Sequence, residues 1–438
     1  MRVPVPPRRR LPDLRSFLGG LKTSDTGRAA GLGVAVIAAN VLALVFTIIF
    51  ARVLGASGYG SLAVLLSAFI IMMVPGSALQ IAAAREISQD LAAGEPDAGA
   101  GVYRWLMRLA VATLIVAALA IPLRPLIGAL INVDELWAAA AVPVTAMLWI
   151  ILAVERGVLQ GFQRYQTVAF SIIGEASSRI AFALLLVGVG LDVTGAFLGS
   201  AMSLLAVALV LLVPLRRQLA GTASDQENPA RLRDLLAGAW VPVIGLTLLL
   251  ALQEVHIIIV KHEASADAAG SYAVVAVAAK AIIWIAVGLG MYLLPEAARR
   301  GKTGIDARPI LLRTVALIGA AAVPMVLIYT FAGKALLAAV FGDDLTQASD
   351  ALPWLGLAMT LLACAYLSVQ YLLAMGRASF IWVLAVCLIL ETVLLILIGA
   401  NLAAVALALF AVQVLCASTT LLLSVRQSGP SVGAPVAV

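Results

Sequence analysis

The chain contains little charge, few histidines and few cysteines. Charged residues make up 12% of the 438, and there are two histidines and three cysteines. Cys364, Cys387 and Cys416 form no CxxC pair, which argues against a zinc site or a disulfide framework. The sequence also lacks HExxH, GxSxG and GxxxxGK[ST] motifs. These absences predict a protein that is not an enzyme and has no metal site and no cofactor.

Apolar sequence is what the chain has in abundance. Hydrophobic residues make up 63% and the mean hydropathy is +1.07, so polar surface is too scarce to cover a soluble body of this size. A helix needs about 20 apolar residues to cross about 30 Å of hydrocarbon. Twelve stretches reach that length, near 31–50, 59–84, 105–123, 136–155, 167–190, 193–214, 236–259, 269–294, 310–332, 350–373, 378–399 and 401–424. We therefore predict an all-α polytopic membrane protein with 12 transmembrane helices.

The 29 basic residues are distributed unevenly along the predicted topology. If the N-terminus is cytoplasmic, most of them lie in inner segments, and Arg52, Arg124, Lys261 and Lys334 are the four in outer loops. Cytoplasmic loops of membrane proteins carry such an excess of Lys and Arg. We expect a plasma-membrane protein with both termini in the cytoplasm. The net charge of +6 then reflects topology and does not argue for nucleic acid.

A sequence echo indicates that the chain is built twice. The segment GSLAV, which begins at Gly60, returns 210 positions later as GSYAV, which begins at Gly270. At the same offset Arg124 maps onto Lys334, and Asp134 maps onto Asp344. Because each copy crosses the membrane an even number of times, we expect two parallel-repeat six-helix lobes around a central cavity. Gly60 and Gly270 should be equivalent outer turns that lead into spans 2 and 8.

Polar stretches divide the chain into five parts. The longest central one, RRQLAGTASDQENPARLRDLL from Arg216, contains Gly, Pro, Ser and Asn and is typical of a linker. We predict a basic cytoplasmic N-terminal segment, an N-lobe with spans 1–6, a cytoplasmic linker, a C-lobe with spans 7–12 and a cytoplasmic tail. Their bounds are 1–30, 31–215, 216–235, 236–425 and 426–438.

Charges inside the predicted spans are the candidates for function. Arg179 lies at the centre of span 5 and Lys280 near the centre of span 8, where a basic group costs about 2.5–3.5 kcal/mol. Glu391 is central in span 11, and Glu254 lies in the outer third of span 7. Such groups should face protein or a wet cavity. Arg179 either pairs with Glu175, four residues earlier, or is left for a substrate.

Three further residues have two interpretations each. Arg52 and Arg85, at opposite ends of the first two spans, either bind lipid phosphates at the cavity mouths or anchor the helices at the interface. Trp284 lies one turn after Lys280. This pairing suits a cavity that binds phosphate and sugar, and it suits internal helix packing nearly as well.

Four segments carry a resemblance to a known family. The segment from Ala51 to Phe69, ARVLGASGYGSLAVLLSAF, resembles the "A-R-x-L-G-x-x-x-Y-G" segment of polysaccharide exporters. GVLQGFQRYQ from Gly157, SADAAGSYAVVAVAAK from Ser265 and LLAMGRASF from Leu372 are similar to later segments of the same proteins, in the same order. The chain thus resembles the oligosaccharide-lipid flippases (Wzx type) of the multidrug, oligosaccharidyl-lipid and polysaccharide (MOP) exporter superfamily.

The resemblance implies a function and a site. Spans 1, 2, 7 and 8 would line a central cavity, and an undecaprenyl-diphosphate-linked oligosaccharide would move from the inner to the outer leaflet by alternating access, for cell-surface polysaccharide synthesis. Membrane lipids and the polysaccharide assembly machinery are the other expected partners. Arg52, Arg85 and Lys280 would contact phosphate beside Trp284, with Arg179 a weaker candidate.

Two other functions stay open. A cation-coupled multidrug exporter of the same superfamily would use Glu254 or Glu391 as its ion site. A membrane glycosyltransferase or polymerase would need an outward-facing acidic or arginine cluster on sizeable outer loops. The predicted outer loops are short, which disfavours the enzyme.

Overall fold

The computed structural model describes residues 25–93, 101–219, 229–302 and 305–426, and these residues are helical almost throughout. Within these ranges no strand forms, so the predicted all-α membrane fold is confirmed. Most of the predicted N-terminal segment and nearly all of the predicted tail lie outside the described residues. Helix covers both ends of the predicted linker, because α7 (Asp192–Leu219) and α8 (Pro229–Glu263) extend into it.

Ten helical stretches of the described residues are long and apolar enough to cross a membrane. Two of them, Gly31–Ala92 with 62 residues and Tyr165–Leu219 with 55, are far longer than the roughly 20 residues that one crossing needs. Each contains a break with positive φ, at Gly55 (67°) in the first stretch and at Gly190 (88°) in the second. Division at these breaks gives twelve arms, and the count of twelve crossings stays a prediction.

The first group of helices, called the N-lobe below, comprises α2 to α7. Besides α7 its members are α2 (Asp25–Met72), α3 (Val74–Ala92), α4 (Val102–Ile131), α5 (Leu136–Gly161), α6 (Tyr165–Leu186) and the π-helical turn η1 (Val187–Leu191). Between α2 and α3 the chain breaks at Met73, just before Pro75, whose ring lacks the N–H that a helix interior needs. At its other end, α4 stops at Asn132, which adopts left-handed backbone angles (φ 53°).

The second group, called the C-lobe, comprises α8 to α14 and repeats this plan. It contains α8, α9 (Ala266–Ala279), α10 (Ala281–Lys302), α11 (Arg308–Phe341), η2 (Asp343–Leu345), η3 (Ser349–Ala351), α12 (Leu352–Ala374), α13 (Phe380–Ile398) and α14 (Leu402–Arg426). The second span of the C-lobe breaks at Lys280, between α9 and α10. The second span of the N-lobe breaks in the same way at Met73, between α2 and α3. α11 ends at Gly342 (φ 110°), 210 positions after Asn132.

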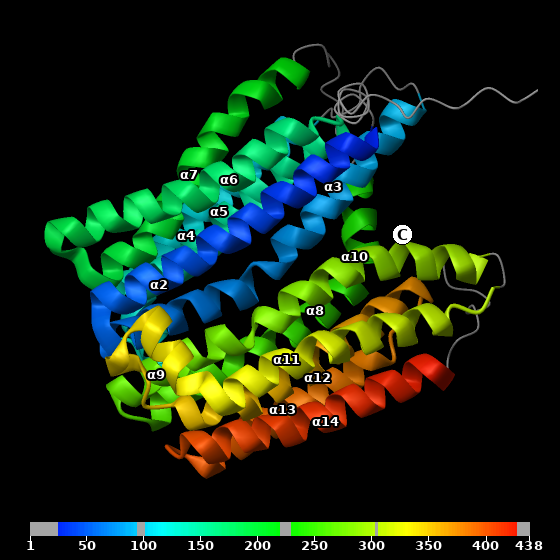
Figure 1. Ribbon diagram of the computed structural model, residues 1–438. Coiled ribbons are helices and arrows are strands. Elements are labelled where there is room, and N and C mark those ends of the chain that lie inside the picture. The colour runs from blue at the N-terminus through cyan, green and yellow to red at the C-terminus, as the bar shows by residue number, and fades with distance from the viewer. Residues whose placement is uncertain (1–24, 94–100, 220–228, 303–304, 427–438) are drawn as a thin grey trace, which may run out of the picture.

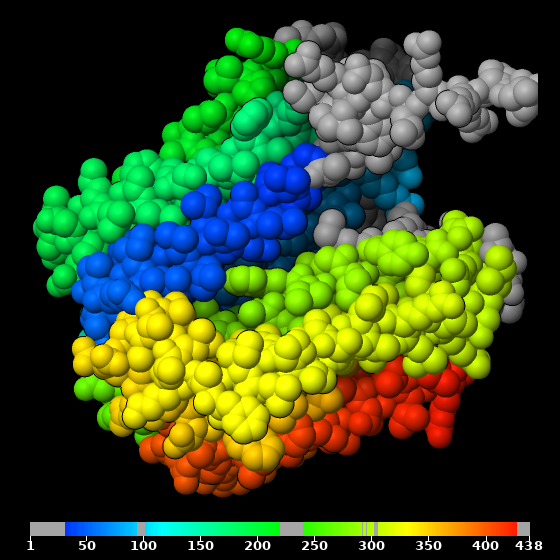
Figure 2. Space-filling view, in the orientation of Figure 1, coloured from blue at the N-terminus to red at the C-terminus, as the bar shows by residue number. Residues whose placement is uncertain are grey.

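The two lobes touch at one end and separate toward the other (Figure 1). Inside the N-lobe α5 packs on α3, α4 and α7, and inside the C-lobe α12 packs on α10, α11 and α14. Contacts between the lobes join α2 to α8 and α9. The space-filling view shows the lobes in contact on the left and a recess between them on the right (Figure 2). We call these the closed end and the open end.

The repeated glycines meet at the closed end. Gly60 lies in α2 and Gly270 in α9, so neither is the turn that the sequence predicted. A Cβ added to Gly60 would lie 3.1 Å from the Gly270 nitrogen, and one added to Gly270 would collide with the carbonyl oxygen of Ala56. The backbones of α2 and α9 therefore approach each other where any side chain would hold them apart.

Candidate substrate and coupling site between the lobes

A buried ion pair of the C-lobe lies at the boundary with the N-lobe, near the break between α9 and α10. The Lys280 Nζ lies 2.7 Å from the Glu254 Oε2, and these residues are 9% and 1% exposed. The same carboxylate oxygen accepts a hydrogen bond from the Ser67 Oγ at 2.7 Å, and the Gln253 Nε2 donates to the other oxygen at 2.9 Å. Since Ser67 belongs to α2 and the other residues to the C-lobe, Glu254 binds to both lobes.

This arrangement unites two residues that the sequence analysis assigned to different functions. Lys280 was expected to meet phosphate, and Glu254 was a candidate ion site. The short distance between their charged groups means that each neutralises the other in this conformation. A phosphate that approached Lys280 would therefore compete with the carboxylate of Glu254.

A second buried polar contact joins the same two helices, α8 and α9, and was missed from the sequence. The Tyr272 hydroxyl and the His256 Nδ1 are 3.0 Å apart, and both side chains are fully buried. Their rings pack edge to face with centroids 5.6 Å apart. The sequence signal was available, because His256 follows Glu254 by two residues on the same predicted span and Tyr272 lies inside the repeated segment.

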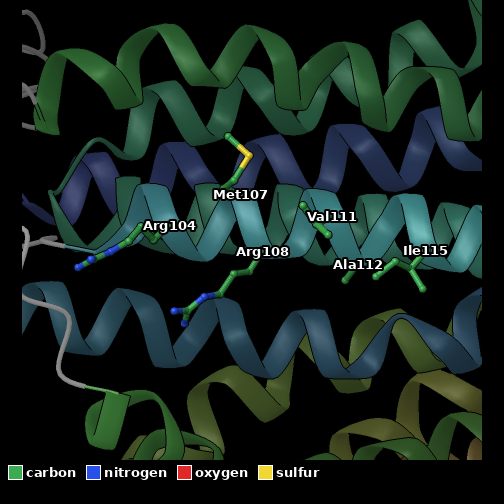
Figure 3. Close-up of a pocket in the computed structure, with 6 residues that line it drawn as sticks. All are labelled: Arg104, Met107, Arg108, Val111, Ala112 and Ile115. Carbon is green, nitrogen blue, oxygen red and sulfur yellow. The ribbon is translucent and has the colours of Figure 1, made fainter.

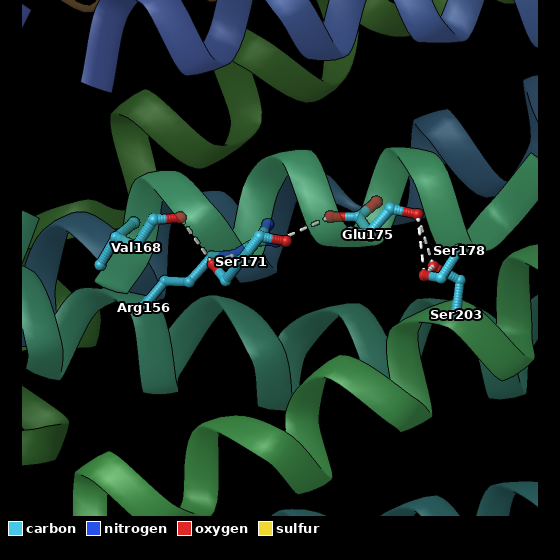
Figure 4. Close-up of polar contacts among 6 residues, drawn as sticks. All are labelled: Arg156, Val168, Ser171, Glu175, Ser178 and Ser203. Carbon is cyan, nitrogen blue, oxygen red and sulfur yellow. Dashed lines mark hydrogen bonds and ion pairs between the residues drawn. The ribbon is translucent and has the colours of Figure 1, made fainter. Parts of the chain in front are cut away.

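Glu175 has a different ion-pair partner from Arg179, which was one of the two alternatives for that arginine. Glu175 binds to Arg156, with 2.9 Å between its Oε2 and the Arg156 Nη2, and the Arg156 Nε donates to the Ser171 Oγ at 3.0 Å (Figure 4). From α7, the Ser203 Oγ donates to the Glu175 carbonyl oxygen at 2.7 Å. Arg156 lies one residue beyond the predicted span 136–155, yet it is buried in α5, and its partners lie on the neighbouring helix α6.

Arg179 is a half-buried cation in the N-lobe. Its guanidinium carbon lies 4.9 Å from the centre of the Phe46 ring on α2, a cation–π geometry. Its Nε is buried and has no hydrogen-bond partner among the described residues. No ion pair within the described part of the chain involves it. A half-buried guanidinium whose Nε donor is buried and unmet is suited to an anionic ligand.

Arg52, Arg85 and Trp284 occupy different parts of the molecule. Arg52 at the closed end donates to the carbonyl oxygens of Ala339 and Val340, so its guanidinium is engaged by the C-lobe. Arg85 is exposed on α3, toward the open end. Trp284 is 40% exposed on the first turn of α10. The described structure therefore does not gather the predicted phosphate contacts at one point.

Glu391 lies inside the C-lobe between α13 and α14. It is fully buried, and its Oε2 accepts a hydrogen bond from the Gln413 Nε2 at 3.0 Å. Its Oε1 is buried with no hydrogen-bond partner in the described ranges. A buried carboxyl with an unmet oxygen suits a bound proton or a small cation.

A groove runs along α4 on the surface of the N-lobe. Its volume is about 350 Å³, and it is lined by Arg104, Met107, Arg108, Val111, Ala112 and Ile115. The two arginines extend toward the start of α4 at the open end, and the apolar side chains follow along the helix (Figure 3). A basic end with apolar walls is the pattern that a lipid-facing groove near a membrane surface would have.

Among the described residues no group of three or more His, Cys, Asp and Glu side chains is arranged to hold a metal ion. The three cysteines are free thiols, and Cys387 and Cys416 are buried.

Comparisons with solved structures show the fold. The chain is similar to a multidrug resistance MATE family transporter of the MOP superfamily in an inward-facing conformation (TM-score 0.74, 12% identity, 89% of this chain and 94% of that chain covered). The outward-facing conformation of a MATE family transporter gives a TM-score of 0.60 at 14% identity, with 93% and 97% covered. The lipid II flippase MurJ, in an inward closed conformation, gives 0.68 at 13% identity, with 90% and 87% covered. The fold is that of a multi-pass membrane transporter of the MOP superfamily.

The family is shown by sequence. A family model described as "Polysaccharide biosynthesis protein" matches residues 29–299, more than half of the chain. The protein belongs to this polysaccharide biosynthesis family, which confirms the resemblance drawn from the sequence motifs. A comparison with curated protein sequences gave no match.

Proposed function

We propose that the protein is a flippase that moves a polyprenyl-diphosphate-linked oligosaccharide from the inner to the outer leaflet of the plasma membrane. The observation that carries this proposal is the half-buried cation Arg179, whose Nε is buried and has no hydrogen-bond partner among the described residues, in a chain of the polysaccharide biosynthesis family. The fold shared with a lipid II flippase supports a lipid-linked cargo.

The shape of the molecule suits such a cargo. A diphosphate needs a cationic, wet path between the lobes, while the polyprenyl tail can stay in the lipid beside them. Most of the basic residues lie at the helix ends on the same side as the recess at the open end. We place this side, together with both termini, in the cytoplasm. The cargo would load there, and reporter fusions at each terminus would test this orientation.

The ion pair at the lobe interface offers a way to couple cargo to movement. A diphosphate on Lys280 replaces Glu254 as the counter-ion, because both anions compete for one ammonium. The Glu254 carboxylate also accepts the hydrogen bond from Ser67 of the other lobe. Arrival of the headgroup therefore leaves the carboxylate that Ser67 contacts without its cation and changes the charge balance at the lobe boundary. Arg85, Arg179 and Trp284 stay proposed contacts along the path. Contact with polysaccharide assembly proteins at the outer face also stays a proposal.

The test is transport in proteoliposomes that contain a fluorescent polyprenyl-diphosphate oligosaccharide. Arg179→Gln removes the half-buried cation and should lower the transport rate at least tenfold, since a charge-assisted hydrogen bond contributes about 1.5–3 kcal/mol. Arg124→Gln is the matched control, because Arg124 also stacks on an aromatic ring, Trp137 at 4.3 Å, but on the exposed surface. Equal rates for both variants at equal amounts of folded protein would refute the role of Arg179.

A cation-coupled exporter is the second candidate, and Glu391 is the observation that favours it. Its fully buried carboxyl has an unmet oxygen among the described residues, as a proton or cation site requires. The same liposomes with an imposed pH or sodium gradient and an amphipathic drug cation would test it. Drug uptake that follows the gradient and is lost in Glu391→Gln would support this function over the flippase.

A further inference from the structure

Arg52 forms a hydrogen-bonded contact from the N-lobe to the C-lobe at the closed end. Its Nε donates to the Val340 carbonyl oxygen at 3.0 Å, and its Nη2 donates to that of Ala339 at 2.8 Å. Both acceptors lie in the last turn of α11, where carbonyl groups have no partner within the helix and the helix dipole is negative. The arginine of one lobe thus caps a helix of the other.

A second contact runs in the reverse direction. The His262 Nε2, in the last turn of α8, lies 3.0 Å from the Leu130 carbonyl oxygen in the last turn of α4. Because a carbonyl oxygen only accepts, the Nε2 of the imidazole carries the hydrogen. The Asn132 Nδ2 adds a bond to the Lys261 carbonyl oxygen at 2.6 Å. Here a helix of the N-lobe is capped from the C-lobe.

The two contacts are copies of one another. His262 stands 210 positions after Arg52, and Val340 stands 210 positions after Leu130, the same offset that links Gly60 to Gly270. Each contact joins the first helix of one lobe to the end of the third long helix of the other, as a twofold axis between the lobes requires. The donor residue and the acceptor residue of one contact are thus both related to those of the other contact by the repeat.

We infer that the closed end is a duplicated gate, with two symmetry-related clasps on either side of a glycine contact. The Arg52 clasp and the His262 clasp cap helix ends across the lobe boundary, while Gly60 and Gly270 let α2 and α9 touch through their backbones. Arg52, Asn132 and His262 are exposed, so each bond exchanges easily with water, as a gate that must open requires. The gate operates with any cargo, so it does not rest on the proposed function.

Distances between spin labels test the clasps. Labels on Asp134→Cys and Asp344→Cys, which are exposed and equivalent in the repeat, report the gap between the lobes by pulsed electron paramagnetic resonance in nanodiscs. The three native cysteines are first replaced by alanine. Arg52→Gln or His262→Gln should raise the population with a long distance about fivefold, and the double variant should raise it further. Arg124→Gln is the control and should leave the distances unchanged.

One substitution separates a clasp from general damage. His262→Arg makes the second clasp like the first and should keep the gate at least as closed as in the parent protein, because Arg also donates to the Leu130 carbonyl oxygen. Parent-like distances in Arg52→Gln, in His262→Gln and in the double variant would overturn the inference. The labels need no cargo, so a failed transport assay does not affect this result.

A glycine series tests the contact between the clasps. Gly270→Ala should move the labels apart, because its Cβ collides with the Ala56 carbonyl oxygen, and Gly60→Ala should move them less. Gly174→Ala in α6 is the matched control, because nothing lies within 4 Å of its added Cβ. Distances in Gly270→Ala that equal those of Gly174→Ala would show that the glycine contact does not set the closure.

Discussion

The ion pair between Lys280 and Glu254 allows a structural role to be separated from a role in substrate binding. Lys280→Met leaves the Glu254 carboxylate buried beside Ser67 without its cation, and removal of one partner from a buried pair costs about 3–5 kcal/mol. At roughly 2 °C per kcal/mol for a chain of this size, the unfolding midpoint should fall by about 6–10 °C. Lys334→Met is the control, because Lys334 is exposed on α11.

The double variant Lys280→Met with Glu254→Gln gives the decisive comparison. It removes both charges, so it should recover at least half of the lost midpoint, while Ser67 can still bond to the new amide. Transport of the diphosphate-linked oligosaccharide should stay low, because the cation is missing. Midpoints are measured in detergent at one heating rate by loss of the monodisperse peak in size-exclusion chromatography. A double variant that transports at the parent rate would refute the proposed phosphate contact. A double variant whose midpoint falls by the sum of the falls in the two single variants would refute the pairing.

Two further predictions concern packing inside the N-lobe. Arg156→Gln should destabilise the protein by about 1.5–3 kcal/mol, because the partly buried Glu175 carboxylate loses its charge-assisted hydrogen bond. Arg124→Gln should change stability by less than about 1 kcal/mol, and equal midpoints of the two variants in detergent would contradict the prediction. Gly157→Ala should force α5 away from α3, because its Cβ would collide with the backbone of Gln80, and should lower the midpoint well below that of Gly174→Ala.

The sequence predicted the membrane fold well, because span length and apolar composition are local properties. The apolar runs located the helices, and Pro75, which lacks an N–H, lies at the break at Met73. The break at Lys280 contains no proline, and it was not predicted. The repeat identified Gly60 and Gly270 as equivalent positions, but the prediction placed them in turns. A constant offset in the sequence relates two positions without indicating their backbone conformation.

The candidate site was harder to predict, because pairing partners lie on different helices. Spacing within one helix suggested Arg179 for Glu175, but Arg156 approaches from α5. The same limit applies to Arg52, which the sequence shows only as a basic residue after a span, while its acceptors lie 287 and 288 positions away. Long-range partners of this kind leave no mark in the spacing of a single sequence.

The contact of Gly60 with Gly270 lies at the closed end, close to the point about which the lobes would tilt. A helix of about 30 residues is roughly 45 Å long, so a tilt of about 10° around the closed end moves its far end by roughly 8 Å. A shift at the glycines no larger than one methyl group is then amplified into a change in the width of the recess. The smallest residues of the chain thus lie where a small volume has the largest effect on the opening.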